Sequence, residues 1–258
     1  TAPASQKTQG VVTTGGDNQV AGYWNSGNTG VDITVPIADD SSINGGTVQL
    51  LVSTDGGGSF VPLDTPSTIS AVNTNKTISV ASGVLEGVAG FGESDVLQFK
   101  ATITDTSGNA TTGTVSDTTL TVDQTAATIS TSSIASDNAT VTLAKTGDTV
   151  TLTIATNENV SSPTVTFTSG GAAATNADTV SGASPGTSFT SAYTVDASDT
   201  DGTVAISITA TDVAGNTTSG FTTISAGSVT VDQTAPASQK TQGVVTTGGD
   251  NQVAGYWN

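Results

Sequence analysis

Apolar and polar residues alternate along several short stretches of this chain. The apolar positions are Val31, Ile33, Val35 and Ile37; Val48, Leu50 and Val52; Leu97, Phe99, Ala101 and Ile103; Val150, Leu152 and Ile154; Val165 and Phe167; and Val204, Ile206, Ile208 and Ala210. Successive residues of a β-strand point to opposite faces of a sheet, so each stretch predicts a strand with one buried face and one solvated face. No stretch has a helical period. The pattern therefore predicts an all-β fold.

Gly, Asn, Asp and Ser residues separate these stretches, and short strands bounded by such residues are typical of β-sandwiches. We expect about seven strands per sandwich. The segment STDGGGSF at residues 53–60 predicts a hairpin turn, because its glycines can adopt positive φ angles. A phosphate-binding glycine loop would precede a helix and lie near a basic residue, and this segment does neither.

The chain repeats itself on two scales. Residues 1–25 recur unchanged as residues 234–258, which sets a long period of 233 residues. Within that period, TITDTSGNATTG…LTVDQTAA at residues 102–127 matches TATDVAGNTTSG…VTVDQTAP at residues 209–236. We therefore predict one sandwich at residues 1–123, a second at 124–233 and the start of the next copy at 234–258. Tandem units of this kind contact their sequence neighbours and extend along one direction.

The last 25 residues are too few to form a sandwich alone. One interpretation is that they belong to a longer ordered array. The other is that they pair with another chain by strand donation, which would build a head-to-tail fibre.

The composition excludes several functions. The 22 acidic residues outnumber five lysines, there is no arginine, and the net charge is −17, so nucleic acid is not expected as a partner. The chain has no Cys and no His, which excludes disulfides, thiolate nucleophiles, serine triads and zinc hydrolysis. Paired carboxylates hydrolyse glycosidic bonds in other proteins, but this chain has few aromatic residues that could hold a sugar substrate. We expect no enzymatic activity, and no apolar run is long enough to span a membrane.

Three motifs indicate a family. The TDxxGN loop, the VDQTAP segment some twenty residues later, and YTVDASDTDG at residues 193–202 together resemble the bacterial immunoglobulin-like (Big-type) domains of giant surface adhesins and biofilm-associated proteins. The resemblance is strong over residues 124–236 and moderate over 1–123, where GYWNSGNTGVDITVPI is less typical. It implies tandem immunoglobulin-like β-sandwiches arranged as an extended rod on the cell surface, with calcium near the domain junctions. The implied partners are neighbouring repeats and other copies in a fibre or biofilm matrix.

Strand direction groups four residues at the start of the second sandwich. Successive strands reverse, so the loops after the second and sixth strands lie beside the preceding linker. This places Glu158, Asp212 and Asn216 next to Asp123 of the linker. Calcium takes six to eight oxygen ligands, and three carboxylates without a cation would repel each other. The sequence therefore predicts a Ca²⁺ site here, and the alternative is that these acids only keep the surface soluble.

The first sandwich has an equivalent group in Asp39, Asp40, Asp105 and Asn109. Its linker carboxylate would come from a preceding repeat, while Asp232 would serve the following one. We expect a complete ion site at the central junction and incomplete sites at both ends.

Two further features have alternative interpretations. Asp196, Asp199 and Asp201 have a DxD spacing but lack the terminal Glu and flanking helices of an EF-hand, so they are either calcium ligands near Asp232 or a capped, solvated turn. The pair Tyr23 and Trp24 either packs in a core or junction, or marks a ligand surface.

The leading hypothesis for the function is a calcium-stiffened spacer of an extracellular protein. The alternatives are a module that binds a glycan or protein, and a self-assembling fibre subunit.

Overall fold

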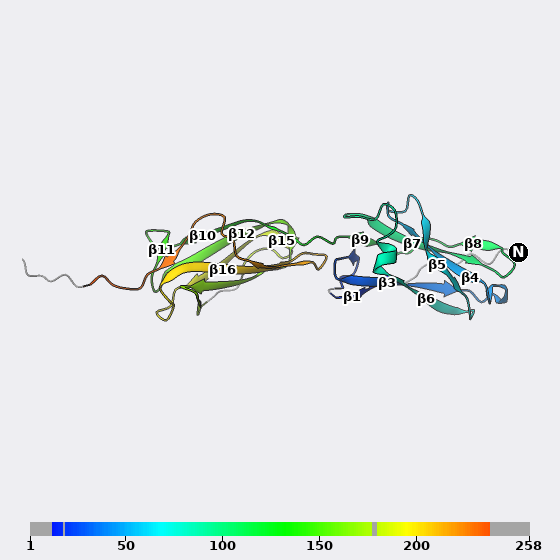
Figure 1. Cartoon of the computed structure of the whole chain (residues 1–258), viewed down its shortest axis with the longest axis horizontal. Helices are drawn as coiled ribbons and strands as arrows, with labels where there is room; N and C mark the ends of the chain where they lie inside the picture. Colours follow the sequence, from blue (N-terminus) through cyan, green and yellow to red (C-terminus); the bar gives the residue numbers. More distant parts are fainter. Residues whose placement is uncertain (1–11, 18, 177–179, 238–258) are drawn as a thin grey trace, which may run out of the picture.

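The computed structural model describes residues 12–17, 19–176 and 180–237. These residues form two β-sandwiches that lie end to end along the long axis of the molecule, joined by a short linker (Figure 1). The all-β prediction is confirmed. No helix in the described part is long and apolar enough to cross a membrane. The expectations for the final repeat copy fall mostly on residues 238–258, outside the described residues.

The first sandwich is built from two antiparallel layers. Its strands are β1 (Val12–Gly16), β2 (Tyr23–Trp24), β3 (Asn28–Ile37), β4 (Thr47–Ser53), β5 (Val61–Thr68), β6 (Thr74–Ala81), β7 (Val96–Thr104), β8 (Ala110–Thr112) and β9 (Leu120–Val122). One sheet has the order β1-β3-β6, and the other has the order β2-β9-β7-β4-β5 with β8 also paired to β7. Among the described strands of this unit, β2 and β9 are the one parallel pair, and an isolated parallel bridge joins Asp55 to Val96.

The second sandwich repeats this plan. Its strands are β10 (Ile129–Ser136), β11 (Leu143–Ala144), β12 (Thr149–Val160), β13 (Thr164–Ser169), β14 (Ala172–Ala173), β15 (Gly186–Thr194), β16 (Gly202–Thr211), β17 (Thr217–Phe221) and β18 (Thr230–Val231). The order is β10-β12-β15 in one sheet and β11-β18-β16-β13-β14 in the other, with β17 also paired to β16. The short strands β11 and β18 run parallel, as β2 and β9 do.

The strand pairing is that of an immunoglobulin-like sandwich. In the second unit β12 pairs with β15 in one sheet while β13 pairs with β16 in the other, so the chain crosses repeatedly between layers. In the first unit β3 pairs with β6 and β4 with β7 in the same way. Two packed antiparallel sheets connected in this manner define the fold.

Each sandwich buries its own core. The predicted inward-facing positions are at most 4 % exposed, except Val165, which is partly buried. The largest side chains of the two cores include Phe99 in the first and Phe189 and Tyr193 in the second. Trp24 is fully buried as well, which favours the core interpretation of the Tyr23-Trp24 pair.

The structure differs from the expectation in strand number and in helix content. Each unit has nine strands within the described residues rather than about seven, because several are pairings of only two or three residues. A 3₁₀ turn at Ser41–Ile43 and one α-helical turn at Ser82–Leu85 (α1) were not predicted. A single turn is too short to show a period, although each buries one apolar residue, Ile43 or Leu85.

The hairpin predicted at residues 53–60 is confirmed. β4 and β5 are antiparallel neighbours, and Gly56 and Gly57 between them have φ angles of 70° and 102°. The carboxylate of Asp55 accepts hydrogen bonds from the hydroxyls of Ser53 at 2.5 Å and Ser59 at 2.8 Å. These bonds hold the pKa of Asp55 well below its usual range.

Candidate functional site

The candidate site lies where the linker enters the second sandwich. We call the end of a sandwich that faces the preceding unit its proximal pole, and the opposite end its distal pole. Strands β12 and β16 both end at the proximal pole of the second sandwich, where Val160 and Asp212 form an isolated antiparallel bridge. Asp123 follows directly after β9 of the first sandwich. The linker therefore brings its carboxylate to the ends of β12 and β16.

Glu158 reaches the site through an irregular part of a strand. We expected it in the loop after the second strand of this sandwich, whereas it lies within β12, where the pairing with β15 shifts register between Ala155 and Val160. Such bulges bend a strand and redirect its side chains.

The structure brings together the three carboxylates that the sequence grouped. One carboxylate oxygen from each of Asp123, Glu158 and Asp212 lies within 4.8 Å of the others. Asp212 is buried, and the other two are partly exposed. We call these three residues the junction carboxylates. Carboxylate oxygens at this spacing are a donor set suited to a hard cation such as calcium.

Asp212 also has a structural role within its own loop. Its Oδ1 accepts hydrogen bonds from the backbone N–H groups of Ala214 and Asn216, both at 2.9 Å. Its Oδ2 accepts from Asn216 Nδ2 at 3.0 Å. The TDVAGN loop is therefore closed by its own aspartate, and Oδ2 keeps acceptor capacity toward the other carboxylates.

Asn216 joins three parts of the molecule. Its Nδ2 donates to the backbone oxygen of Asp123 at 2.9 Å, and its Oδ1 accepts from the backbone N and Oγ of Ser26 at 3.0 and 2.8 Å. Asn25 Nδ2 donates to the carbonyl oxygen of Ala214 at 2.6 Å. Ser26 and Asn25 belong to the first sandwich, so this one loop contacts the first sandwich and the linker directly.

Two glutamates of the first sandwich hold the linker. The backbone N of Gln124 donates to both carboxylate oxygens of Glu93 at 3.1 Å, and the Thr125 hydroxyl donates to the same carboxylate. Glu86 Oε1 accepts from Gln124 Nε2 at 2.8 Å and from the indole N–H of Trp24 at 3.1 Å. Sequence reasoning missed Glu86, Glu93, Asn25 and Ser26. The recurring Gln-Thr pair of the linker, which needs acceptors, was the available signal.

Burial and like charge disfavour ionisation at the junction. Desolvation is the main cause of the raised pKa values of Asp123 and Glu158. Repulsion from Asp212 and Glu93 adds to it in both cases, and repulsion from Asp123 adds to it for Glu158. Among the described residues the ion pair between Lys145 and Asp148 is the only one, and it lies at the other pole of the second sandwich. No protein cation within that part of the chain therefore offsets the four acids.

At the proximal pole of the first sandwich the predicted residues serve their own turns. Asp105 accepts from the backbone N–H groups of Ser107 and Asn109, both at 2.8 Å, and from Asn109 Nδ2 at 2.9 Å, and these bonds lower its pKa. Asp40 accepts from the backbone N and Oγ of Ser42 at 2.9 and 2.7 Å. The described residues bring no group of three carboxylates together here, at Asp39 or elsewhere on this pole.

The acidic loop near the end of the second sandwich lies beside Asp232, as expected from strand direction. Asp196 accepts from the backbone N and Oγ of Ser198 at 2.9 and 2.7 Å, which caps the turn. Asp199 accepts from the backbone N of Asp196 at 2.8 Å. Asp201 accepts from the backbone N of Gln233 at 2.9 Å and from the Thr234 hydroxyl at 2.8 Å. These carboxylates act as acceptors for the turn and the linker, and in the described part they form no three-carboxylate group.

Comparison with known proteins gives structural similarity only. No family model and no curated protein matches the chain. A titin I-band fragment, I67–I69, is 10 % identical with a TM-score of 0.38, covering 78 % of this chain and 59 % of that one. A tetra-tandem repeat from the extending region of a large adhesion protein is 21 % identical with a TM-score of 0.30, covering 87 % of this chain and 50 % of that one. SGBP-B from the mixed-linkage glucan utilization locus of Bacteroides ovatus, solved in complex with a mixed-linkage heptasaccharide, is 16 % identical with a TM-score of 0.22, covering 90 % of this chain and 46 % of that one. The fold assignment rests on the sheet pairing described above.

Proposed function

We propose that this chain is a structural segment of a long extracellular adhesin or surface filament protein, in which calcium stiffens the joints between immunoglobulin-like units. The observation that supports it best is the interlocked junction. Asn216 binds both the linker backbone and Ser26 of the preceding unit, beside three converging carboxylates. Side chains from both units and the linker meet in one place, as a fixed joint requires.

The negative charge at the junction is the reason to propose calcium there, because a divalent cation would offset the repulsion between the acids. Asp212 and Glu93 lie close enough to Asp123 and Glu158 for their charges to raise the pKa values of those two carboxyl groups. A divalent ion would replace this repulsion with shared coordination, and water and nearby amide or carbonyl oxygens would complete its six to eight ligands. The ion would thereby restrict the hinge at the linker.

The aromatic residues favour a spacer over a sugar-binding module. Protein surfaces that bind sugars commonly present exposed aromatic rings, but Trp24 and Tyr193 are fully buried here. The large exposed apolar side chains of the described part are Val61, Val84, Val141 and Leu143, none of them aromatic. A glycan- or protein-binding module and a fibre subunit remain the alternative functions. A hit on a glycan array would support the first, and concentration-dependent association in sedimentation would support the second.

Small-angle X-ray scattering on the 258-residue chain tests the stiffening. We expect a well-defined rod with calcium, and a broader distribution of end-to-end distances after chelation. The variant Glu158→Gln removes one junction carboxylate without touching the TDVAGN loop, and it should weaken calcium binding in calorimetry. Asp64→Asn is the matched control, since Asp64 is an exposed acid on β5 of the first sandwich. Identical scattering with calcium and with chelator would remove the stiffening role.

A further inference from the structure

The distal pole of the second sandwich reproduces the strand pairing, the loop closure and the backbone contacts of the linker seen in the first. The backbone N of Asp123 donates to Trp24 O at 2.9 Å, and the backbone N of Asp232 donates to Ala144 O at 2.9 Å. In both units these bonds continue a short parallel pairing, β2 with β9 and β11 with β18. Asp232 therefore occupies the position of Asp123.

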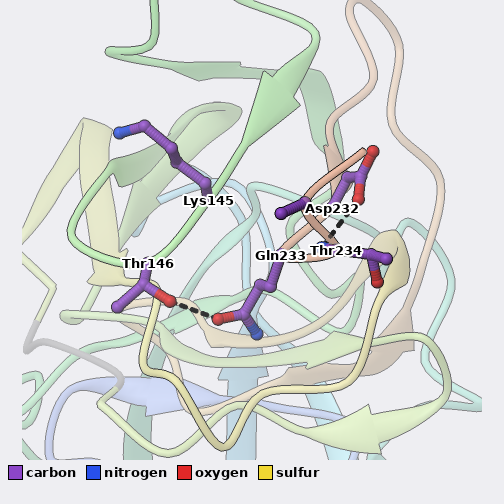
Figure 2. A pocket seen from close by; sticks show the side chains of 6 residues that line it. Lys145, Thr146, Asp232, Gln233 and Thr234 are labelled. Carbon is purple, nitrogen blue, oxygen red and sulfur yellow. Dashed lines mark hydrogen bonds between the residues drawn. The ribbon is translucent and has the colours of Figure 1, made fainter. Parts of the chain in front are cut away.

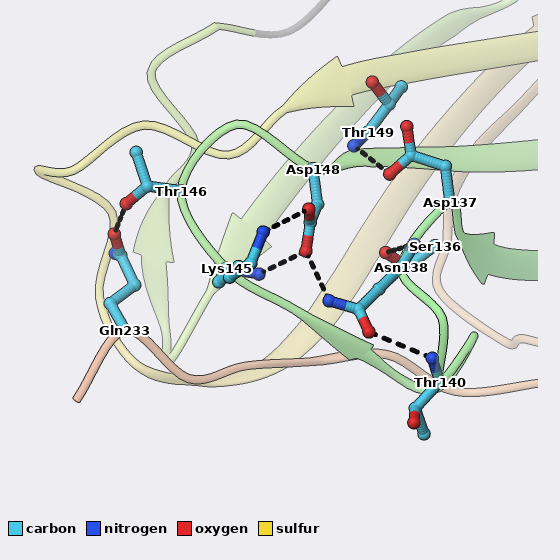
Figure 3. A network of polar contacts seen from close by, with 9 residues as sticks. All are labelled: Ser136, Asp137, Asn138, Thr140, Lys145, Thr146, Asp148, Thr149 and Gln233. Carbon is cyan, nitrogen blue, oxygen red and sulfur yellow. Dashed lines mark hydrogen bonds and ion pairs between the residues drawn. The ribbon is translucent and has the colours of Figure 1, made fainter. Parts of the chain in front are cut away.

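The loop after each of these short strands is also the same. Asn28 Oδ1 accepts from the backbone N of Asn25 at 2.8 Å, and Asp148 Oδ2 accepts from the backbone N of Lys145 at 2.9 Å (Figure 3). Each loop is closed by a return bond to the carbonyl of its first residue, at 3.1 and 3.0 Å. Lys145 thus occupies the position of Asn25, and Thr146 that of Ser26.

The linker is held alike at both poles. Glu93 accepts from the backbone N of Gln124 and from the Thr125 hydroxyl, and Asp201 accepts from the backbone N of Gln233 and from the Thr234 hydroxyl. Figure 2 shows Gln233, Thr234 and Asp232 beside Lys145 and Thr146. These residues, with Ala235, line an open hollow of about 340 Å³ at the distal pole.

The complementary loop exists in the first sandwich. Asp105 and Asn109 make the same internal hydrogen bonds as Asp212 and Asn216. In the second sandwich Ala214 and Asn216 of this loop are buried under the preceding unit, whereas Ser107, the counterpart of Ala214, is exposed. Residues 104–109 thus form a preorganised loop whose docking face is uncovered in the described structure.

We propose that the distal pole of the second sandwich is a docking surface for residues 104–109 of a following copy of the first sandwich. The occupant follows from the sequence, because residues 234–258 repeat residues 1–25. In this joint the backbone N–H of Thr146 donates to Asn109 of the next copy, as Ser26 does to Asn216. Lys145 donates to the carbonyl of Ser107, as Asn25 does to Ala214. The inference rests on the proposed role as a repeat segment.

The same correspondence makes the two kinds of joint chemically different. The central joint has four acids and an amide, Asn25. The second joint would contain Asp148, Asp201 and Asp232 with Asp39 and Asp105 of the next copy, together with the ammonium group of Lys145. The Lys145 side chain is 65 % exposed, and its Nζ is paired with Asp148 Oδ1 at 2.9 Å. Asp148 also accepts from Asn138 Nδ2 at 2.7 Å and from the Lys145 backbone N at 2.9 Å, so it keeps two partners when the ammonium turns toward the other acids of the joint. Joints along the array therefore alternate between one that depends on a divalent ion and one that carries its own cation.

Distances measured by electron–electron double resonance in a chain of two consecutive periods would test this alternation. The protein has no cysteine, so nitroxide labels can be attached to cysteines introduced at the exposed strand residues Ser79 on β6 and Thr153 on β12. One labelled pair spans a central joint, and the other runs from Thr153 of the first period to Ser79 of the second. Chelation should broaden the first distance distribution about twofold and leave the second nearly unchanged. Lys145→Asn should make the second joint respond as the first does, while Lys100→Gln, which removes a charge on β7, should not.

Engineered disulfides test the docking geometry independently of any ion. Thr146→Cys in the first period with Asn109→Cys in the second should form a bond under mild oxidation. Ser26→Cys with Asn216→Cys within one period is the positive control, since Ser26 Oγ and Asn216 Oδ1 are 2.8 Å apart. If the control forms and the first pair does not, the docking surface is wrong. If both joints respond equally to chelator, or Lys145→Asn has no effect, the alternation is wrong although calcium stiffening stands. If the central joint ignores chelator, the proposed function itself fails.

Discussion

The two TDxxGN loops are the same local structure in two different settings. Asp105 and Asp212 each accept two backbone N–H groups and one asparagine side chain, with donor–acceptor distances of 2.8–3.0 Å. Their surroundings differ. The loop at Asp212 lies under Asn25 and Ser26 of the first sandwich, whereas the loop at Asp105 is partly open.

The comparison separates the fold of the loop from its use at a joint. The internal hydrogen bonds are present with and without a neighbouring unit, so the loop does not need one to adopt its shape. The joint then uses groups that these bonds leave available, namely the Asn216 side-chain oxygen and the Ala214 carbonyl. The second oxygen of Asp212 accepts from Asn216 Nδ2 and keeps capacity for a further partner. A motif of six residues can therefore serve as a turn in one unit and as a turn and a joint in another.

The largest expected effect comes from removing the loop aspartate. Asp212→Ala leaves the backbone N–H groups of Ala214 and Asn216 without an acceptor in a buried setting, and each such group costs about 1–3 kcal/mol. We expect a loss of about 3 kcal/mol in the unfolding free energy of the second sandwich, measured by urea denaturation. Asp105→Ala removes the same bonds where water can replace them.

Asp105→Ala should therefore cost the first sandwich distinctly less. Equal losses for the two variants would show that burial by the neighbouring unit contributes nothing, and the distinction between the two settings would not hold.

A smaller effect is expected from the two asparagines. Asn216→Ala removes the bonds to Ser26 and to the Asp123 backbone, for about 1–2 kcal/mol. It should also widen the distribution of angles between the sandwiches in small-angle scattering. Asn109→Ala removes only the bond to its own Asp105 among those described, and should leave the scattering unchanged. A joint that is equally rigid in both variants would show that Asn216 does not connect the units.

Strands and core could be predicted because they depend on local alternation. Every stretch with apolar residues at every second position is a strand, and residues such as Ile33, Phe99 and Ile208 are buried as expected. The short pairings β2, β11, β14 and β18 could not be predicted, because two residues show no pattern and their pairing depends on distant segments.

The junction was predictable in part for the same reason. Asp123, Glu158 and Asp212 follow from strand direction, which fixes the end of the sandwich at which each residue lies. Glu86, Glu93 and Asn25 come from loops whose approach to the linker depends on how the units pack, and no periodicity reports that. The acidic loop at residues 196–201 has a metal-like spacing, but the structure uses Asp196 and Asp201 as acceptors for backbone N–H groups.

The smallest expected effect is the pH dependence of stability. It has opposite signs for the raised pKa values at the junction and for the lowered pKa of Asp105. The pKa values of Asp123 and Glu158 are raised from 3.8 and 4.5, so the folded chain holds these protons at pH values where the unfolded chain has lost them. Their contribution to stability therefore falls as pH rises through the raised pKa values. In chelator, acidification from about pH 7 to pH 5 should stabilise the second sandwich by about 0.5 kcal/mol or less after solvent screening. The pKa of Asp105 is lowered from 3.8, so this group changes stability only when the pH falls below about 3.8, and it should not affect the first sandwich between pH 7 and pH 5.

Calcium should reverse the trend in the second sandwich, because protons compete with the ion for the carboxylates. Denaturation curves at two pH values, with and without calcium, measure this, and Glu158→Gln should flatten the dependence. A second sandwich that loses stability on acidification in chelator would contradict the repulsion on which the ion-dependent joint is based.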